Sequence, residues 1–155
     1  IGFLNVHQSF NYGYQRKNAY EKFHKDKNIK LNLKYYQESL DHATVTGINL
    51  SKKLLDLKDP PTAIICSLDK YFIGCLQECQ RRGLVIAKDI SVVGYNDQDN
   101  YLSSQNVTYI SHPLAEMGKM AIKMLEQLDQ GEKPENLTQL IKPILNKGKS
   151  DGRVS

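Results

Sequence analysis

Cysteine is scarce in this sequence, with three residues in a chain of 155. An odd number in a domain of this size does not indicate a disulfide framework. Cys66 falls in an apolar segment, whereas Cys75 and Cys79 share one face of a predicted helix without a histidine or carboxylate at ligand spacing. We therefore predict three small buried thiols in a reducing compartment, which favours a cytoplasmic location, and we expect no metal and no cofactor.

Long hydrophobic runs are also missing. The sequence offers no apolar stretch of the ~20 residues that a transmembrane helix needs, and its beginning has no secretory signal pattern. The chain opens on Ile1 directly in an apolar run, and we expect it to be a piece of something longer. With 40% hydrophobic and 25% charged residues, its composition is that of one globular domain.

Positive charge is in modest excess, but it is not gathered into one surface. The net charge of +4 arises from lysines interleaved with acidic residues and from a basic C-terminal stretch. No basic run alternates with aromatic residues in the manner of a nucleic-acid interface. We expect solvated charged faces and no direct contact with nucleic acid or membrane.

Catalytic motifs are absent as well. The sequence has no nucleophile elbow, no zinc-protease helix, no phosphate-binding loop and no dinucleotide fingerprint after its first apolar segment. Its four histidines share no ligand spacing. We therefore predict a binding protein and no enzyme.

Short apolar segments do alternate with helical stripes along the whole chain. Hydrophobic spacing predicts strands over 1–6, 31–36, 63–66, 90–93, 107–111 and 137–145. Helices are predicted over about 19–27, 44–55, 70–82 and 113–128, with Ser67 or Asp69 capping the third. This order predicts an α/β fold in which a parallel sheet is flanked by helices on right-handed crossovers. The last residues, 147–155, are predicted to fray.

The stretch 89–97, with sequence DISVVGYND, organises this pattern. Its β-branched run predicts a strand buried on both faces, and the polar residues after Gly94 come where an open α/β sheet binds ligands. Other polar side chains follow the other predicted strands, among them Arg16, the Asp41–His42 pair and Asp69. Each could instead be a surface residue, a turn former or a helix cap. Their shared placement favours a site that binds a polyhydroxylated ligand through guanidinium, amide and carboxylate groups.

Several motifs resemble the effector-binding domain of the LacI/GalR repressors. They are, in order, PTAIICSLD at 61–69, IG at 73–74, RGL at 82–84, DISVVGYND at 89–97 and TYISHPLAEMG at 108–118. The opening Ile1-Gly2-Phe3, and Arg16 placed before Ala19-Tyr20, are similar to that family's first strand and helix start. The resemblance spans nearly the whole chain and implies the C-terminal lobe of a periplasmic-binding-protein-like (type I) fold.

The resemblance also implies which residues bind the effector. Arg16 matches the family's effector-binding arginine, Asn96 stands where an acid is usual, and His42 stands near a position that is often aromatic. His112 replaces a usual glutamine, and Leu68 replaces the asparagine usual before Asp69. The predicted ligand-binding set is Arg16, His42, Asp69, Asn96, Asp97 and His112. These departures argue against a simple hexose and leave a different sugar, a modified sugar or no small molecule as alternatives.

The domain organisation follows from the same resemblance. Residues 1–145 are expected to form the effector-binding fragment, with 107–130 belonging to the other lobe of a longer protein, and 146–155 to form a polar tail. The N-terminal DNA-binding part would be missing, so operator DNA is a partner only through it. We expect a homodimer with contacts from 70–82 and 98–104. The apolar stripe over 114–128 needs a further partner, either dimer contacts or a repacked position within the chain.

Two other functions stay open from sequence alone. One is the sugar-binding component of a transport system, which shares this fold. The other is a flavodoxin-like enzyme that uses Asp69 or Asp97 as its acid, although the absence of catalytic motifs disfavours it.

Overall fold

The computed structural model describes residues 1–95, 101–134 and 137–152 of the chain. Within these residues one six-stranded sheet has the order β2-β1-β3-β4-β5-β6. The first five strands are parallel neighbours, and the last pairs antiparallel with β5. Their bounds are β1 Gly2–Val6, β2 Tyr36–Ser39, β3 Ala63–Cys66, β4 Ser91–Tyr95, β5 Tyr109–Ser111 and β6 Ile144–Asn146. The predicted α/β class with a parallel sheet flanked by helices is confirmed.

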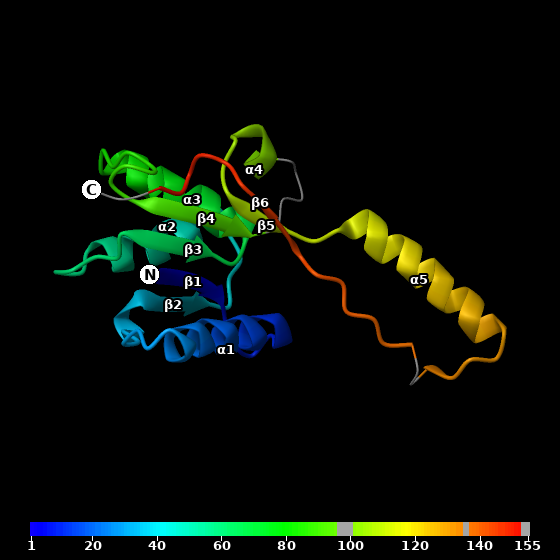
Figure 1. Ribbon diagram of the computed structural model, residues 1–155. Helices are drawn as coiled ribbons and strands as arrows, with labels where there is room; N and C mark the ends of the chain where they lie inside the picture. The colour runs from blue at the N-terminus through cyan, green and yellow to red at the C-terminus, as the bar shows by residue number, and fades with distance from the viewer. Residues whose placement is uncertain (96–100, 135–136, 153–155) are drawn as a thin grey trace.

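Helices lie on both faces of this sheet (Figure 1). One face carries α1 (Asn11–Asp26), and the other carries α2 (Thr44–Leu55) and α3 (Asp69–Arg81). The short helix α4 (Tyr101–Ser104) connects β4 to β5, and the longer α5 (Leu114–Asp129) follows β5. Right-handed crossovers explain why α1 lies on one face while α2 and α3 lie on the other. The chain first runs outward from β1 to β2, and it then crosses back over β1 to β3 and on to β4.

The core lies between the sheet and the α2–α3 pair. Leu4, Ile64, Val92 and Phe72 are all fully buried there. The two helices approach closely because Gly47 faces the backbone of α3 and Gly74 faces the backbone of α2; a Cβ on Gly74 would come within 2.4 Å of the Thr44 carbonyl oxygen. The predicted buried thiols Cys66, Cys75 and Cys79 belong to this core and are free.

The second strand lies later in the chain than predicted. The alternating residues 31–36 form instead an extended stretch and a 3₁₀ turn, η1 (Leu33–Tyr35), before β2 starts at Tyr36. The Asn32 side chain accepts a hydrogen bond from the Lys34 amide and so caps this turn. Leu33 is 71% exposed, so the apolar alternation there did not mark a buried face.

The predicted cap of the third helix is also wrong. Leu68 occupies the N-cap position of α3 without a side-chain cap bond. The Ser67 hydroxyl accepts a hydrogen bond from the Val6 amide, and the Asp69 carboxylate accepts one from the Lys70 amide. Both side chains therefore satisfy other groups.

The described part of the tail, 147–152, is packed and not frayed as expected. Ser150 is buried; its hydroxyl donates to the Val92 carbonyl and accepts from the Thr108 amide. The Gly152 amide donates to the Ser91 hydroxyl, and Lys147 pairs with Asp151. The tail thus holds the ends of β4 and β5 together.

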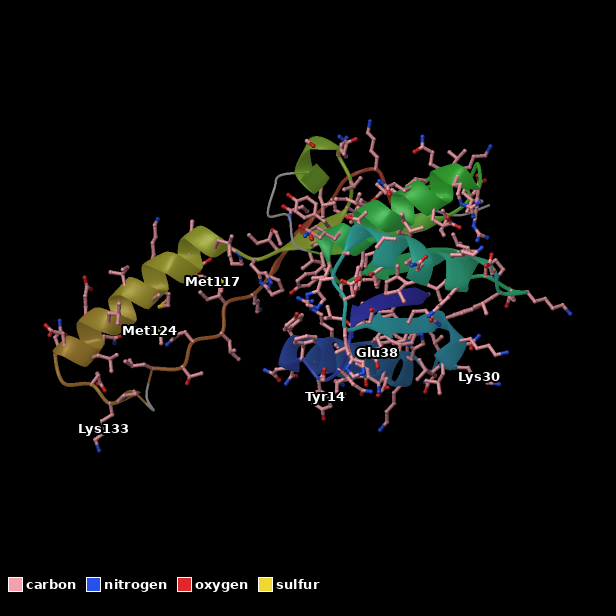
Figure 2. The ribbon with its side chains drawn as sticks, turned by 180° about the vertical axis from the view of Figure 1, so that it is seen from behind. Tyr14, Lys30, Glu38, Met117, Met124 and Lys133 are labelled. Carbon is pink, nitrogen blue, oxygen red and sulfur yellow. The ribbon has the colours of Figure 1, made fainter. Side chains whose placement is uncertain are left out.

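The helix α5 projects away from the sheet, as both views of the chain show (Figures 1 and 2). None of its residues is buried. The returning segment covers one side of it, enclosing a pocket of about 320 Å³ between Met117, Met120, Met124 and residues 139–141. The expectation of either dimer contacts or a repacked position for this helix stays a prediction.

Candidate ligand-binding site

Arg16 stands at the edge of the sheet where the parallel strands end. Its guanidinium donates a hydrogen bond of 3.0 Å to the Ser67 carbonyl oxygen, just after β3. The guanidinium carbon lies 3.9 Å from the centre of the Tyr95 ring, at the end of β4, and 5.2 Å from the Tyr12 ring in α1. One carbonyl and two aromatic faces thus fix a cation that keeps donors available for a ligand.

Aromatic rings continue from this arginine in both directions. Tyr12 stacks on Phe10 at 5.6 Å, and Phe10 packs against His42 at 5.2 Å. On the other side Tyr95 meets His112 edge to face at 5.3 Å. Five rings therefore line the carboxyl edge of the sheet, the position at which open α/β sheets bind ligands.

His42 lies in the loop before α2 and is partly buried. Its Nε2 atom is inaccessible to solvent and has no hydrogen-bond partner among the described residues. Beside it, the Thr46 hydroxyl donates to Asp41, and this bond holds the pKa of that carboxyl below its usual value. The Asp41 carbonyl oxygen accepts from Tyr71, a residue whose burial raises its pKa to about 12. The loop that carries His42 is therefore well anchored.

Asn5 is a fully buried polar residue near the carboxyl end of β1. Its amide nitrogen donates to the Gly13 carbonyl at 2.8 Å and to the Tyr36 hydroxyl at 3.0 Å. Its carbonyl oxygen is buried with no partner among the residues that the structure describes. Gly13 is required here because a Cβ would lie 2.4 Å from the His7 carbonyl oxygen. The start of α1, and with it Tyr12 and Arg16, is thereby pinned to β1.

The structure describes four of the six predicted ligand-binding residues. Arg16 and His112 both contact Tyr95, while His42 reaches this cluster through Phe10 and Tyr12. Asp69 lies at the same edge of the sheet, half-buried at the first turn of α3. Asn96 and Asp97 lie outside the described residues.

Sequence reasoning missed Phe10, Tyr12 and the Ser67 carbonyl as parts of this site. The sequence shows an aromatic segment at 10–14. It does not show that the start of α1 places the rings of Phe10 and Tyr12 at the edge of the sheet. Tyr95 was predicted among the polar residues that follow Gly94. Its contact with the Arg16 guanidinium was not predicted, because it joins segments that are distant in the sequence.

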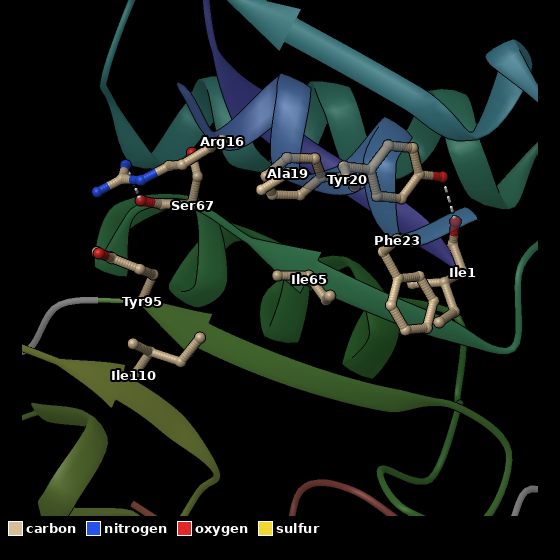
Figure 3. Close-up of a pocket in the computed structure, with 10 residues that line it drawn as sticks. Ile1, Arg16, Ala19, Tyr20, Phe23, Ile65, Ser67, Tyr95 and Ile110 are labelled. Carbon is tan, nitrogen blue, oxygen red and sulfur yellow. Dashed lines mark hydrogen bonds between the residues drawn. The ribbon is translucent and has the colours of Figure 1, made fainter. Parts of the chain in front are cut away.

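An apolar groove runs from this site along α1. It has a volume of about 310 Å³ and lies between α1 and the exposed side of β3, β4 and β5 (Figure 3). Arg16, Ser67 and Tyr95 stand at one end, and Ile1 and Phe23 at the other. Between them the lining is Phe3, Ala19, Tyr20, Ile65 and Ile110.

The described part of the chain holds no candidate metal site and no candidate membrane span. No group of three His, Cys, Asp or Glu side chains there is arranged to hold a metal ion. No helix there is long and apolar enough to cross a membrane.

Residues 1–150 match the family model of the periplasmic binding protein-like domain. The chain belongs to this family. Its match to solved structures extends over nearly its whole length: a LacI-family regulatory protein from Chloroflexus aggregans aligns with 97% of this chain and 54% of its own, with a TM-score of 0.87 and 25% identity. A dimeric Lac repressor aligns with 99% of this chain and 56% of its own, with a TM-score of 0.84 and 23% identity.

Curated relatives are transcriptional repressors. The repressor CytR of Escherichia coli K12 is 32% identical over 59% of this chain and 27% of its own length. The repressor PurR of Vibrio vulnificus is 31% identical over 72% of this chain and 33% of its own length. The resemblance to LacI/GalR regulators is thereby confirmed, while this chain spans only about a third of the curated relatives it matches.

Proposed function

We propose that this chain is the effector-sensing and dimerisation part of a LacI/GalR-type transcriptional regulator that acts in the cytoplasm. The observation that carries the proposal is Arg16, held between Tyr12 and Tyr95 at the end of the parallel strands. The names of the relatives support a regulator over a sugar-binding component of a transport system. No turnover is expected, because the proposed ligand-binding residues that the structure describes include no nucleophile paired with a base.

The proposed effector is a carbohydrate or a related small molecule. A guanidinium fork binds vicinal hydroxyls or an anionic substituent, and aromatic rings stack on the apolar face of a sugar. The ligand-binding residues proposed are Arg16, His42, Asp69, Asn96, Asp97 and His112, joined by Tyr12 and Tyr95. His42 and His112 supply hydrogen-bond donors and acceptors. The buried Nε2 of His42 has no partner among the described residues, and a bound ligand would supply one.

In a longer protein, residues 1–145 would form the effector-binding fragment, with 107–130 crossing into a second lobe and 146–155 as its polar tail. The exposed apolar side of α5 supports this division, since a second lobe would bury it. Effector binding between the lobes would favour a closed state and so change the affinity of an N-terminal DNA-binding part for its operator. The solvent side of α3 and the segment 98–104 are the proposed contacts of the homodimer.

The test begins with a thermal-shift panel of sugars, sugar phosphates and nucleosides on the protein that carries this chain. Operator binding is then measured by fluorescence anisotropy with and without the compound that stabilises it. We expect the dissociation constant for the operator to change about 5- to 150-fold, the usual range of allosteric coupling. Operator affinity that stays constant at saturating effector would contradict the proposed function.

A further inference from the structure

The loop between β1 and α1, residues 7–10, leads directly into the aromatic cluster of the candidate site. Phe10 at its end packs against the rings of Tyr12 and His42. The Phe10 amide donates a hydrogen bond of 3.1 Å to the His7 carbonyl oxygen, which closes the loop into a turn. How firmly the Phe10 ring is held therefore depends on what anchors this turn.

The anchor is Glu38, which lies in β2 (Figure 2). Its Oε2 atom accepts a hydrogen bond of 3.2 Å from the Gln8 backbone amide, and its Oε1 atom accepts one of 3.4 Å from the Gln8 side-chain amide. The Nε2 atom of His7 lies 3.6 Å from the same Oε1 atom. One carboxylate thus contacts two successive residues of the loop.

The hydrogen bonds of His7 orient its ring for this contact. Its Nδ1 atom accepts a hydrogen bond of 3.1 Å from the Ser9 backbone amide, a group that can only donate. In the neutral imidazole the proton is then on Nε2, the atom that faces the Glu38 carboxylate. His7 therefore links the turn at Ser9 to β2.

Glu38 is itself held in place by a chain of polar groups. The Tyr36 hydroxyl donates to its Oε2 atom at 2.8 Å. The Asn5 side-chain amide donates to that hydroxyl at 3.0 Å and to the Gly13 carbonyl oxygen at 2.8 Å. Burial raises the pKa of Tyr36, so its hydroxyl remains a donor at neutral pH. The chain of hydrogen bonds thus runs from Glu38 to the first turn of α1.

The loop is tied to α1 a second time through Gln8. The side-chain oxygen of Gln8 accepts a hydrogen bond of 2.8 Å from the Lys17 ammonium group. Because its amide nitrogen donates to Glu38, Gln8 spans from β2 to the helix that carries Arg16. Strand, loop and helix are therefore joined at this one carboxylate.

We propose that Glu38 is a positioning residue for the effector site. By holding residues 7–10 against β2, it keeps Phe10 packed against Tyr12 and His42 before an effector binds. The apparent affinity of a site scales with the fraction of molecules in which it is assembled, so this anchor strengthens binding without touching the effector. The inference rests on the proposed function for its effector, but the ring packing can be measured without one.

The first experiment records nuclear Overhauser effects between aromatic rings in the effector-free protein that carries this chain, labelled in Phe, Tyr and His. Contacts of Phe10 with Tyr12 and with His42 are expected in the wild type and should be lost in Glu38→Ala. Glu21→Ala is the matched control, because it removes an acid of α1 whose side chain is 42% exposed, and it should keep both contacts. Ring contacts that persist in Glu38→Ala overturn the proposal.

Glu38→Gln is the conservative variant and keeps an acceptor at this position. Its carboxamide oxygen can still accept from the Tyr36 hydroxyl and from the Gln8 backbone amide. The ring contacts should therefore be retained in Glu38→Gln. If they were lost as fully as in Glu38→Ala, positioning through these hydrogen bonds would be refuted.

Binding is then measured by calorimetry with the compound of the thermal-shift panel that stabilises the wild type. The dissociation constant should rise about tenfold in Glu38→Ala, and less than about twofold in Glu38→Gln and Glu21→Ala. Unchanged binding in Glu38→Ala contradicts the proposal, and so does weaker binding with intact ring contacts, which would place Glu38 on the compound itself. If no compound of the panel binds, the proposed function fails, while the ring contacts still decide the role of Glu38.

Discussion

Tyr95 holds the Arg16 guanidinium through its ring and not through its hydroxyl. A cation–π contact contributes about 0.5–2 kcal/mol, depending on how far it is desolvated. Tyr95→Ala should therefore weaken effector binding about 2- to 30-fold. Tyr95→Phe keeps the ring and should bind nearly as the wild type does; equal losses in both variants would show that the hydroxyl matters instead.

Glu78 is the buried acid of α3, and its carboxylate accepts from Arg81 and Arg82 at 2.7 Å. These hydrogen bonds lower its pKa from 4.5 to about 2. Because the folded pKa lies below the unfolded one, the stabilisation is complete above about pH 4.5 and is lost as pH falls toward 2.

Glu78→Gln should therefore lower the free energy of unfolding at pH 7 by about 1–3 kcal/mol. The difference from wild type should shrink between pH 4.5 and 2 in urea titrations, provided that both proteins stay folded there. Lys52→Gln, which breaks only the exposed pair with Asp56, is the control and should cost under about 0.5 kcal/mol. A difference that does not depend on pH would contradict the assignment.

At the scale of elements, the contact between α2 and α3 depends on glycine. A Cβ on Gly74 would meet the Thr44 carbonyl oxygen and the Ile48 amide, both backbone atoms that cannot yield easily. Gly74→Ala should thus lower the free energy of unfolding by about 1–3 kcal/mol or more. Gly118→Ala is the matched control: it lies in α5 with open space around its Cβ, and alanine should there favour the helix by about 0.5–1 kcal/mol. Denaturation of both variants by urea checks the pair.

Most elements could be predicted from the sequence because their apolar residues point to one continuous core. The strands predicted at 63–66 and 90–93 and the helices predicted at 44–55 and 70–82 contribute to that core, and their bounds fall within two residues of the observed ones. The strand β2 could not be predicted in this way. It is a partly buried edge strand whose position depends on pairing with β1 and on the Asn32 turn, neither of which gives a hydrophobic period.

The site was only partly predictable for a similar reason. Arg16 could be named because its surroundings in the sequence resemble a known motif. The partners of Arg16, which are Ser67 and Tyr95, come from strands 51 and 79 residues further along and meet it only in the folded sheet. Phe10 and Tyr12 gave no signal beyond an aromatic composition.

Across the whole molecule, the packed tail joins the last strands to the central sheet. The Ser150 hydroxyl bonds both the Val92 carbonyl and the Thr108 amide in a buried position. Ser150→Ala leaves these groups unpaired and should lower the free energy of unfolding by about 1–3 kcal/mol. Thr138→Ala, at an exposed position of the returning segment, should change it by less than about 0.5 kcal/mol. Equal effects in chemical denaturation would contradict a structural role for the tail.

The proposed function depends on a ligand site built around Arg16, and calorimetric titration of the identified effector tests this site most directly. Loss of hydrogen bonds to a charged group costs about 1.5–3 kcal/mol, so Arg16→Ala should weaken binding about 10- to 150-fold. Arg16→Lys should recover only part of this, because an ammonium lacks the planar fork. Lys25→Ala, on the same helix, should bind as the wild type does. Unchanged affinity in Arg16→Ala would contradict the assignment of this site.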